Sequence, residues 1–81
     1  MVKTKFENVF KKKYIKLRNP LKSRLDKQLE KDIRKPKVGK PMMFGREGTR
    51  EVYISPYRLS YFYDKEKNLI VFLDIYHKDE Q

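Results

Sequence analysis

The sequence contains no cysteine and no tryptophan, only three glycines and a single histidine. Without cysteine, a disulfide framework, a thiolate metal site and a cysteine nucleophile are all excluded. One histidine leaves mainly carboxylates as metal ligands, so we expect no metal and no cofactor. No apolar run is long enough to span a membrane, and residues 1–10 lack the apolar core of a signal peptide. We therefore expect a cytoplasmic protein without a membrane partner.

Positive charge is what the sequence has in excess, and it is concentrated in the first half. Lysine and arginine number 21 against 11 acidic residues, which gives a net charge of +10. Residues 1–40 hold 15 basic and 4 acidic residues, whereas residues 41–81 hold 6 and 7. Such a charge on a small domain attracts polyanions, so nucleic acid is the expected class of partner. The length allows one domain, residues 1–81, with a modest core and a shallow surface site.

The first half shows the periodicity of two helices. Apolar residues recur every three or four positions over residues 6–17 and again over residues 21–33. We expect Asn19 to cap the second helix, with Pro20 in its first turn, and the helix to end before Pro36. Lysines fill much of the remaining surface of the first helix, which makes it amphipathic.

The second half changes to the alternating pattern of strands. The expected strands are residues 52–54, 57–63 and 69–76, separated by Ser55-Pro56 and by the polar loop 64–68. Connections this short join antiparallel neighbours. Residues 37–41 are typical of a loop, and residues 2–6 fit either an edge strand or a lead-in to the first helix. The expected fold is α+β, a helical hairpin packed on a small antiparallel sheet in the order β-α-α-β-β-β.

Three residues of the second half are suited to chemistry. Strand alternation places Arg58 on the opposite face from Leu59, where it is either an inert charge or an anion ligand. His77 follows the last expected strand and is either an acid or base or an ordinary surface histidine. Glu51 is either a base or the partner of a neighbouring cation.

Other basic and aromatic residues are candidates for RNA binding. Lys40, Arg46 and Arg50 bracket two glycines, and this segment is either a phosphate-gripping loop or a solvated one. The lysine cluster of the first helix either contacts a polyanion or is a solvated face. Two tyrosines are available to stack on bases. The candidate RNA-binding residues are Lys11, Lys12, Lys13, Lys40, Arg46, Tyr53 and Tyr76.

The order of these motifs resembles the RelE/ParE superfamily of toxins from type II toxin–antitoxin systems. The matching segments are Gly39-Lys40-Pro41, Tyr57-Arg58-Leu59-Ser60-Tyr61, the turn at 64–68 and Tyr76-His77-Lys78-Asp79. The likeness runs over nearly the whole chain, and the order and spacing of these short motifs carry it. The resemblance implies a RelE-like fold and a RelB-like antitoxin protein that binds the toxin in a hetero-oligomer.

The RelE and YoeB branches of this superfamily imply a metal-independent endoribonuclease that cleaves mRNA at the ribosome and so inhibits translation. Arg58 matches the arginine that acts on the scissile phosphate, His77 matches the near-terminal histidine of YoeB, and Lys78 matches a second catalytic arginine of RelE. Glu51 and Tyr53 replace strand lysines of RelE, with Arg50 adjacent. The candidate catalytic residues are Arg58, His77, Lys78, Arg50 and Glu51.

Two other functions stay open on the sequence. The ParE branch targets DNA gyrase without hydrolysing anything, and an inactive remnant would retain only antitoxin binding. The gyrase-type function is favoured by Met42, which stands where YoeB has its glutamate base, and by the lack of a match to the C-terminal tyrosine of RelE. The joint presence of Arg58, His77 and Lys78 favours the nuclease, because a pure protein binder does not need that set.

Overall fold

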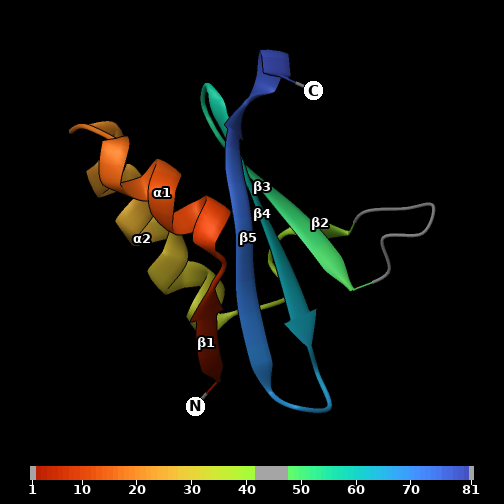
Figure 1. The fold of residues 1–81 in the computed structure, drawn as a ribbon. Helices are drawn as coiled ribbons and strands as arrows, with labels where there is room; N and C mark the ends of the chain where they lie inside the picture. The colour runs from red at the N-terminus through yellow and green to blue at the C-terminus, as the bar shows by residue number, and fades with distance from the viewer. Residues whose placement is uncertain (1, 42–47, 81) are drawn as a thin grey trace.

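Two helices lie against one face of a five-stranded sheet in the computed structural model, which describes residues 2–41 and 48–80 (Figure 1). The order of the strands across the sheet is β1-β5-β4-β3-β2. The elements are β1 (Lys3–Phe6), α1 (Asn8–Lys16), α2 (Leu21–Arg34), β2 (Lys40–Pro41), β3 (Thr49–Ile54), β4 (Tyr57–Asp64), β5 (Leu69–His77) and the short 3-10 helix η1 (Lys78–Glu80).

The sheet is mixed, which corrects the expectation of a purely antiparallel one. Strands β3, β4 and β5 form the predicted antiparallel meander. Residues 2–6 supply an edge strand, β1, which pairs in parallel with β5 from Lys3 opposite Leu69 onward. The helices lie between β1 and the meander in sequence, and parallel pairing requires such a crossover. The segment expected to be a loop at 37–41 ends in the two-residue strand β2, which pairs with β3.

The core lies between the helices and the face of the sheet that they cover. Phe10 of α1 stacks on Phe6 with ring centroids 5.5 Å apart, and Phe6 stacks on Phe72 of β5 at 5.3 Å. Val9, which the periodicity placed on the buried face, is 52% exposed. Pro20 rather than Asn19 occupies the N-cap position of α2, and no side-chain cap hydrogen bond forms there. The other buried apolar residues of the core are Leu25, Leu29, Ile54, Leu59, Tyr61, Ile70 and Ile75.

A bulge between β4 and β5 sets which side chains reach the open face. Leu59 lies opposite Ile75, whereas Tyr61 lies opposite Phe72, so β5 carries one extra residue between these pairs. The extra residue keeps both pairs in the core. Beyond the bulge, Arg58 lies opposite Tyr76, and strand alternation turns both side chains away from the helices.

Candidate active site

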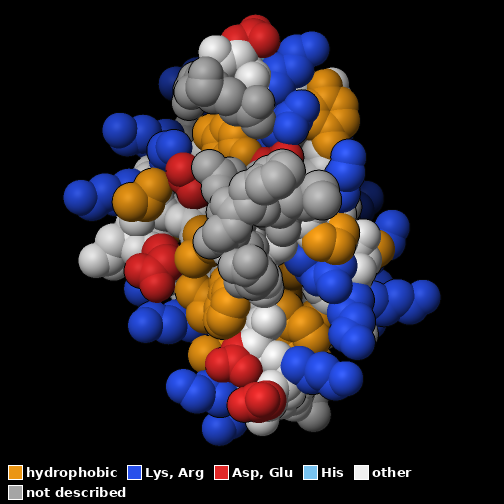
Figure 2. Space-filling view, turned by 90° about the vertical axis from the view of Figure 1, so that its right-hand side faces the viewer, with side chains coloured by type: hydrophobic (Ala, Val, Ile, Leu, Met, Phe, Trp, Pro, Cys, Tyr) orange, Lys and Arg blue, Asp and Glu red, His pale blue; other side chains and the backbone are white. Residues whose placement is uncertain are grey.

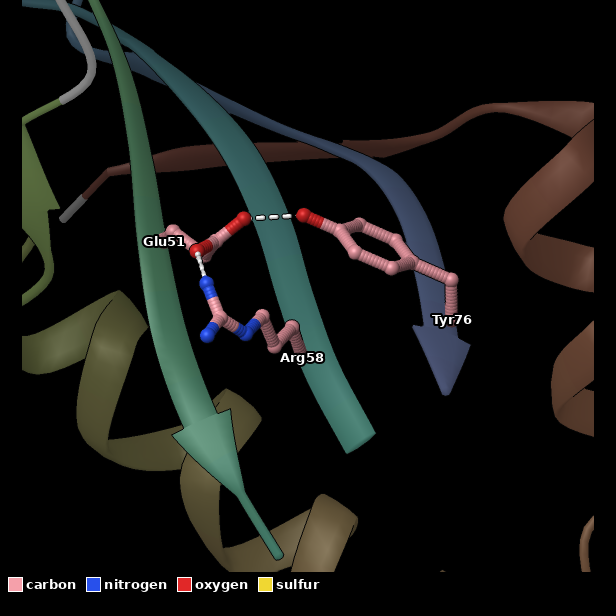
Figure 3. A network of polar contacts seen from close by, with 3 residues as sticks. All are labelled: Glu51, Arg58 and Tyr76. Atoms are coloured by element: carbon pink, nitrogen blue, oxygen red, sulfur yellow. Dashed lines mark hydrogen bonds and ion pairs between the residues drawn. The ribbon is translucent and has the colours of Figure 1, made fainter. Parts of the chain in front are cut away.

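A carboxylate, a guanidinium and a phenol meet on the open face of the sheet, one from each strand of the meander (Figure 3). Arg58 Nη1 donates a hydrogen bond to Glu51 Oε1 at 2.8 Å, which is also an ion pair. The hydroxyl of Tyr76 donates to the other oxygen, Glu51 Oε2. Both carboxylate oxygens are therefore held, and we call these three residues the Glu51 cluster.

The Glu51 cluster is partly withdrawn from water. The Glu51 side chain is 12% exposed and that of Arg58 is 38% exposed. The Nε atom of Arg58 is buried and has no hydrogen-bond partner among the described residues. A buried donor without an acceptor costs free energy.

Two further candidate residues flank the cluster. Lys40 of β2 lies opposite Glu51 in the sheet register, and residues that oppose each other across strands share a face. Tyr53 lies opposite Arg58 and is 54% exposed. Figure 2 views the side away from the helices and shows Lys and Arg around the margin, interspersed with some Asp and Glu, and hydrophobic side chains further in. The open face thus combines a cationic rim with an exposed aromatic ring.

His77 lies on the opposite face of the sheet from the Glu51 cluster, and Lys78 follows it at the end of β5. The ring of His77 meets that of Tyr57 edge-on, with centroids 5.5 Å apart, on the side of the sheet that the helices cover. Its Nδ1 accepts a hydrogen bond from the backbone N–H of Asp79 at 3.2 Å. The Lys78 side chain is exposed, and the Lys78 backbone N–H donates to the carbonyl of Pro56. The structure therefore brings Arg58 together with Glu51 and turns His77 to the other face of the sheet.

Arg50 holds the connection between α2 and β2. Its Nη1 donates to the carbonyl oxygens of Lys37 at 3.0 Å and Gly39 at 2.7 Å. The hydroxyl of Tyr61 accepts the N–H of Gly39 and donates to the carbonyl of Pro36. A Cβ on Gly39 would lie 2.7 Å from that hydroxyl, so glycine is required by this close approach. Arg50 is turned to the opposite face from Glu51, its neighbour in β3.

A buried carboxylate on α2 went unnoticed in the sequence pattern. Asp32 is fully buried, and its Oδ1 accepts a hydrogen bond from Gln28 Nε2 at 2.8 Å. Its Oδ2 has no hydrogen-bond partner among the residues that the structure describes. Burial raises the pKa of Asp32 to about 6. The clue in the sequence is the spacing, since Asp32 is three residues from Leu29, on the apolar side of α2.

The three lysines of the basic cluster have different surroundings. Lys13 forms an ion pair with Asp74 Oδ1 at 2.8 Å, and Lys12 is exposed. Lys11 borders an apolar groove of about 350 Å³ between the helices, in which Ile15 is 75% exposed. The remaining residues of this groove, which we call the helical groove, are Phe6, Phe10, Tyr14 and Leu29.

Two positions of the sequence argument fall outside the described residues, namely Arg46 and Met42. Within residues 2–41 and 48–80, no group of three or more His, Asp or Glu side chains is arranged to hold a metal ion. In the same part of the chain, no helix is long and apolar enough to cross a membrane.

The comparisons with known proteins agree with this architecture. The sequence profile of the ParE toxin of the type II toxin–antitoxin system parDE matches residues 4–81. A search of curated protein sequences finds no match. A chain of the intact E. coli RelBE toxin–antitoxin complex superposes with a TM-score of 0.81 at 21% identity, covering 93% of this chain and 94% of that one.

Two more solved structures share the fold. A chain of the RelBE2 toxin–antitoxin complex from Mycobacterium tuberculosis gives a TM-score of 0.79 at 26% identity, over 95% of this chain and 98% of that one. A chain of the archaeal RelE-RelB complex from Pyrococcus horikoshii OT3 gives 0.78 at 13% identity, over 99% and 98%. In the present protein, two helices on a five-stranded mixed sheet form the RelE-like α+β fold. The chain belongs to the ParE toxin family of type II toxin–antitoxin systems, within the RelE/ParE superfamily.

Proposed function

We propose that this toxin is a metal-independent endoribonuclease that cleaves mRNA, with the Glu51 cluster as its catalytic centre. The observation that carries the proposal is the contact of a carboxylate, an arginine and a phenol on the face of the sheet away from the helices. Cleavage of RNA by its own 2′-hydroxyl needs a proton acceptor, a cation at the phosphate and a proton donor for the leaving oxygen. These three residues are of the types that supply those roles.

In the proposed reaction, Glu51 takes the proton of the 2′-hydroxyl as the 2′-oxygen attacks phosphorus. The guanidinium of Arg58 binds the charged phosphorane oxygens, for which its planar fork is well suited. The bond from phosphorus to the 5′-oxygen breaks, and the Tyr76 hydroxyl gives that oxygen its proton. The products are a 2′,3′-cyclic phosphate and a free 5′-hydroxyl.

The hydrogen bond between Tyr76 and Glu51 also returns both groups to their starting protonation states after each reaction. After the reaction, Glu51 carries the extra proton and Tyr76 lacks one, so transfer along their hydrogen bond restores both groups. Before the reaction, RNA must draw Arg58 away from Glu51, because the ion pair occupies Oε1. The substrate phosphate thus both occupies the arginine and frees the base. Lys40 and Tyr53 at the margin are placed to hold the flanking phosphate and base.

We further propose that the ribosome presents the mRNA and that a RelB-like antitoxin holds the toxin inactive. Solved relatives of the same fold are complexes of toxin with antitoxin. The helical groove, apolar inside and bordered by Lys11, suits an amphipathic segment with acidic residues along its edges. A partner of that charge also neutralises the basic half of the sequence.

Inhibition of DNA gyrase is the second candidate function. The matching profile is that of a ParE toxin, and the Arg58 ion pair with Glu51 also fits a surface that binds protein. Purified protein should be assayed in parallel on translated mRNA, by primer extension with and without EDTA, and on gyrase supercoiling. New 5′ ends that persist in EDTA support the nuclease. Inhibited supercoiling with intact mRNA would replace it with the gyrase function, and inactivity in both assays would indicate a remnant.

A further inference from the structure

A second cleft lies on the helix-covered side of the sheet, behind the Glu51 cluster. It has a volume of about 220 Å³ at the C-terminal end of α1. One wall consists of Lys13, Lys16 and Leu17. The other wall belongs to β4 and β5 and consists of Tyr57, Ile75, Tyr76 and His77. Tyr57 and His77 are sequence neighbours of cluster residues on β4 and β5, so the cleft and the cluster occupy opposite faces of the same strand ends. We call it the His77 cleft.

Aromatic and aliphatic groups give the His77 cleft a surface for a flat ligand. The rings of Tyr57 and His77 meet at an interplanar angle of 77°, so the pair offers both a ring face and a ring edge. Leu17 and Ile75 add apolar surface. Nucleobases stack on such aromatic side chains without requiring a particular sequence.

The polar groups of the cleft favour a negative charge. Lys13 is neutralised by Asp74, whereas Lys16 has no ion pair among the described residues. Nδ1 of His77 accepts the backbone N–H of Asp79, so the neutral imidazole carries its proton on Nε2, a donor. None of the lining residues is acidic, and the nearby carboxylate of Asp79 lies 3.6 Å from Nδ1 of His77 rather than at Lys16. A cation, a hydrogen-bond donor and a pair of aromatic rings together match a nucleotide, in which a nucleobase is linked to a phosphate.

We propose that the His77 cleft binds one nucleotide of a single-stranded RNA, with the base against Tyr57 and His77 and the phosphate at Lys16. The proposal rests on the proposed function only in taking RNA as the polyanion. It gives His77 a role in holding substrate on the opposite face of the sheet from Glu51 and Arg58. An RNA that crosses this end of the sheet would be held on both faces.

Nuclear magnetic resonance of the labelled protein, titrated with adenosine and uridine 5′-monophosphates, tests the proposal. We expect shifts at Lys16, Tyr57 and the His77 ring, and about tenfold weaker binding after Lys16→Gln, because a charge-assisted contact is lost. The matched control is Lys27→Gln, an exposed lysine of α2, which should bind as the parent does. The nucleosides without phosphate should bind the parent as weakly as the monophosphates bind Lys16→Gln.

Three results would overturn the inference: no shifts at the cleft, equal binding by Lys16→Gln and the parent, or shifts with a short acidic peptide but none with nucleotides. The Arg58→Ala protein separates this site from the catalytic centre. It should lose cleavage and retain nucleotide binding at the cleft. A parent protein that binds nucleotides here but cleaves no mRNA would refute the nuclease and support the cleft.

Discussion

Glu51 is the residue on which the proposed chemistry turns, because both of its carboxylate oxygens accept hydrogen bonds. As a strand residue on an open face it has an ordinary structural explanation, namely neutralisation of Arg58. Neutralisation of Arg58 does not require the second hydrogen bond, which the Tyr76 hydroxyl donates to Glu51. A phenol hydrogen-bonded to a carboxylate provides a route for a proton, and the proposed function therefore gives Tyr76 the role of proton donor. The stacking role expected from the sequence stays a prediction.

Tyr76→Phe tests this role directly. The change keeps the ring and removes the hydroxyl, so we expect cleavage of mRNA to slow by about 10²–10⁴-fold, as for loss of a general acid. The free energy of unfolding should fall by only about 1 kcal/mol, the usual worth of one hydrogen bond. Single-turnover cleavage and urea denaturation measure the two effects. Unchanged cleavage would return Tyr76 to a stacking or structural role.

Asp32 gives the clearest pH effect at a single residue. Its pKa is raised from 3.8 to about 6 by burial, so the unfolded chain releases this proton more readily than the folded one. The folded state therefore loses stability as the pH rises from about 4 to above 6, by roughly 3 kcal/mol at most. Below the unfolded pKa, the carboxyl is neutral in both states and costs nothing.

Asp32→Asn removes this cost while keeping an acceptor for Gln28. We expect the variant to be more stable than the parent at pH 7.5, by about 1–2 kcal/mol, and equal to it at pH 4. Thermal unfolding at both pH values measures the difference. The same gain at both values, or a loss at pH 7.5, would show that the ionised carboxylate is not what destabilises the parent.

At the scale of elements, the sequence predicted what depends on long periodic patterns. The two helices and the meander are as expected, since their apolar repeats extend over many residues. The sequence did not decide whether β1 is a strand, because four residues carry too little of an alternating pattern. Strand β2 was not predicted, because its two residues form a strand only by pairing with β3. The bulge in β5 was hidden because that segment is almost continuously apolar.

The candidate site was predictable only in part, because a local pattern gives the face of a side chain within its own strand but not the register between strands. Alternation within β4 placed Arg58 on the open face, as the structure shows. The side on which His77 lies depends on the register of β5 against β4, which pairs it with Tyr57. Arg50 was grouped with the catalytic residues by adjacency alone, yet neighbours in a strand point to opposite faces. Its partners are the carbonyls of a loop distant in sequence.

The lysines of α1 separate into those that are available to RNA and one that is not. RNA affinity should fall with salt on a logarithmic slope of about −0.7 for each phosphate contacted. Lys12→Gln should flatten the slope, because this lysine is exposed, whereas Lys13→Gln should change it less, since Asp74 already neutralises that ammonium. Fluorescence anisotropy with a single-stranded RNA over a range of salt measures both. Equal slopes for the parent and Lys12→Gln would assign Lys12 to solvent.

At the scale of the whole molecule, the face that carries the Glu51 cluster and the helical groove lie on opposite sides of the fold, so an antitoxin segment in the groove would leave the cluster uncovered. Ile15→Glu places a charge in the groove at a side chain that is 75% exposed, so the fold should be kept. We expect binding of the cognate antitoxin to weaken by at least about tenfold, because a charge must be desolvated. Cleavage of mRNA by the free toxin should persist.

The control for this prediction is Ser23→Glu, which adds the same charge at an exposed position of α2 outside the groove. Calorimetry with purified antitoxin should give it the affinity of the parent. Equal weakening by both variants would mean that overall charge, rather than the groove, governs antitoxin binding.

Cleavage of translated mRNA by the Arg58→Ala toxin, read by primer extension, tests the central claim most directly. We expect the rate to fall by about 10²–10³-fold, as when one donor to a developing charge is removed. Stability should fall by about 1–3 kcal/mol, because the Glu51 carboxylate, whose side chain is only 12% exposed, loses its partner. Circular dichroism must therefore confirm that the variant is folded. Arg24→Ala, which removes an arginine that binds the Ser55 carbonyl, is the matched control and should cleave as the parent does. A folded Arg58→Ala protein that cleaves as fast as the parent would contradict the account.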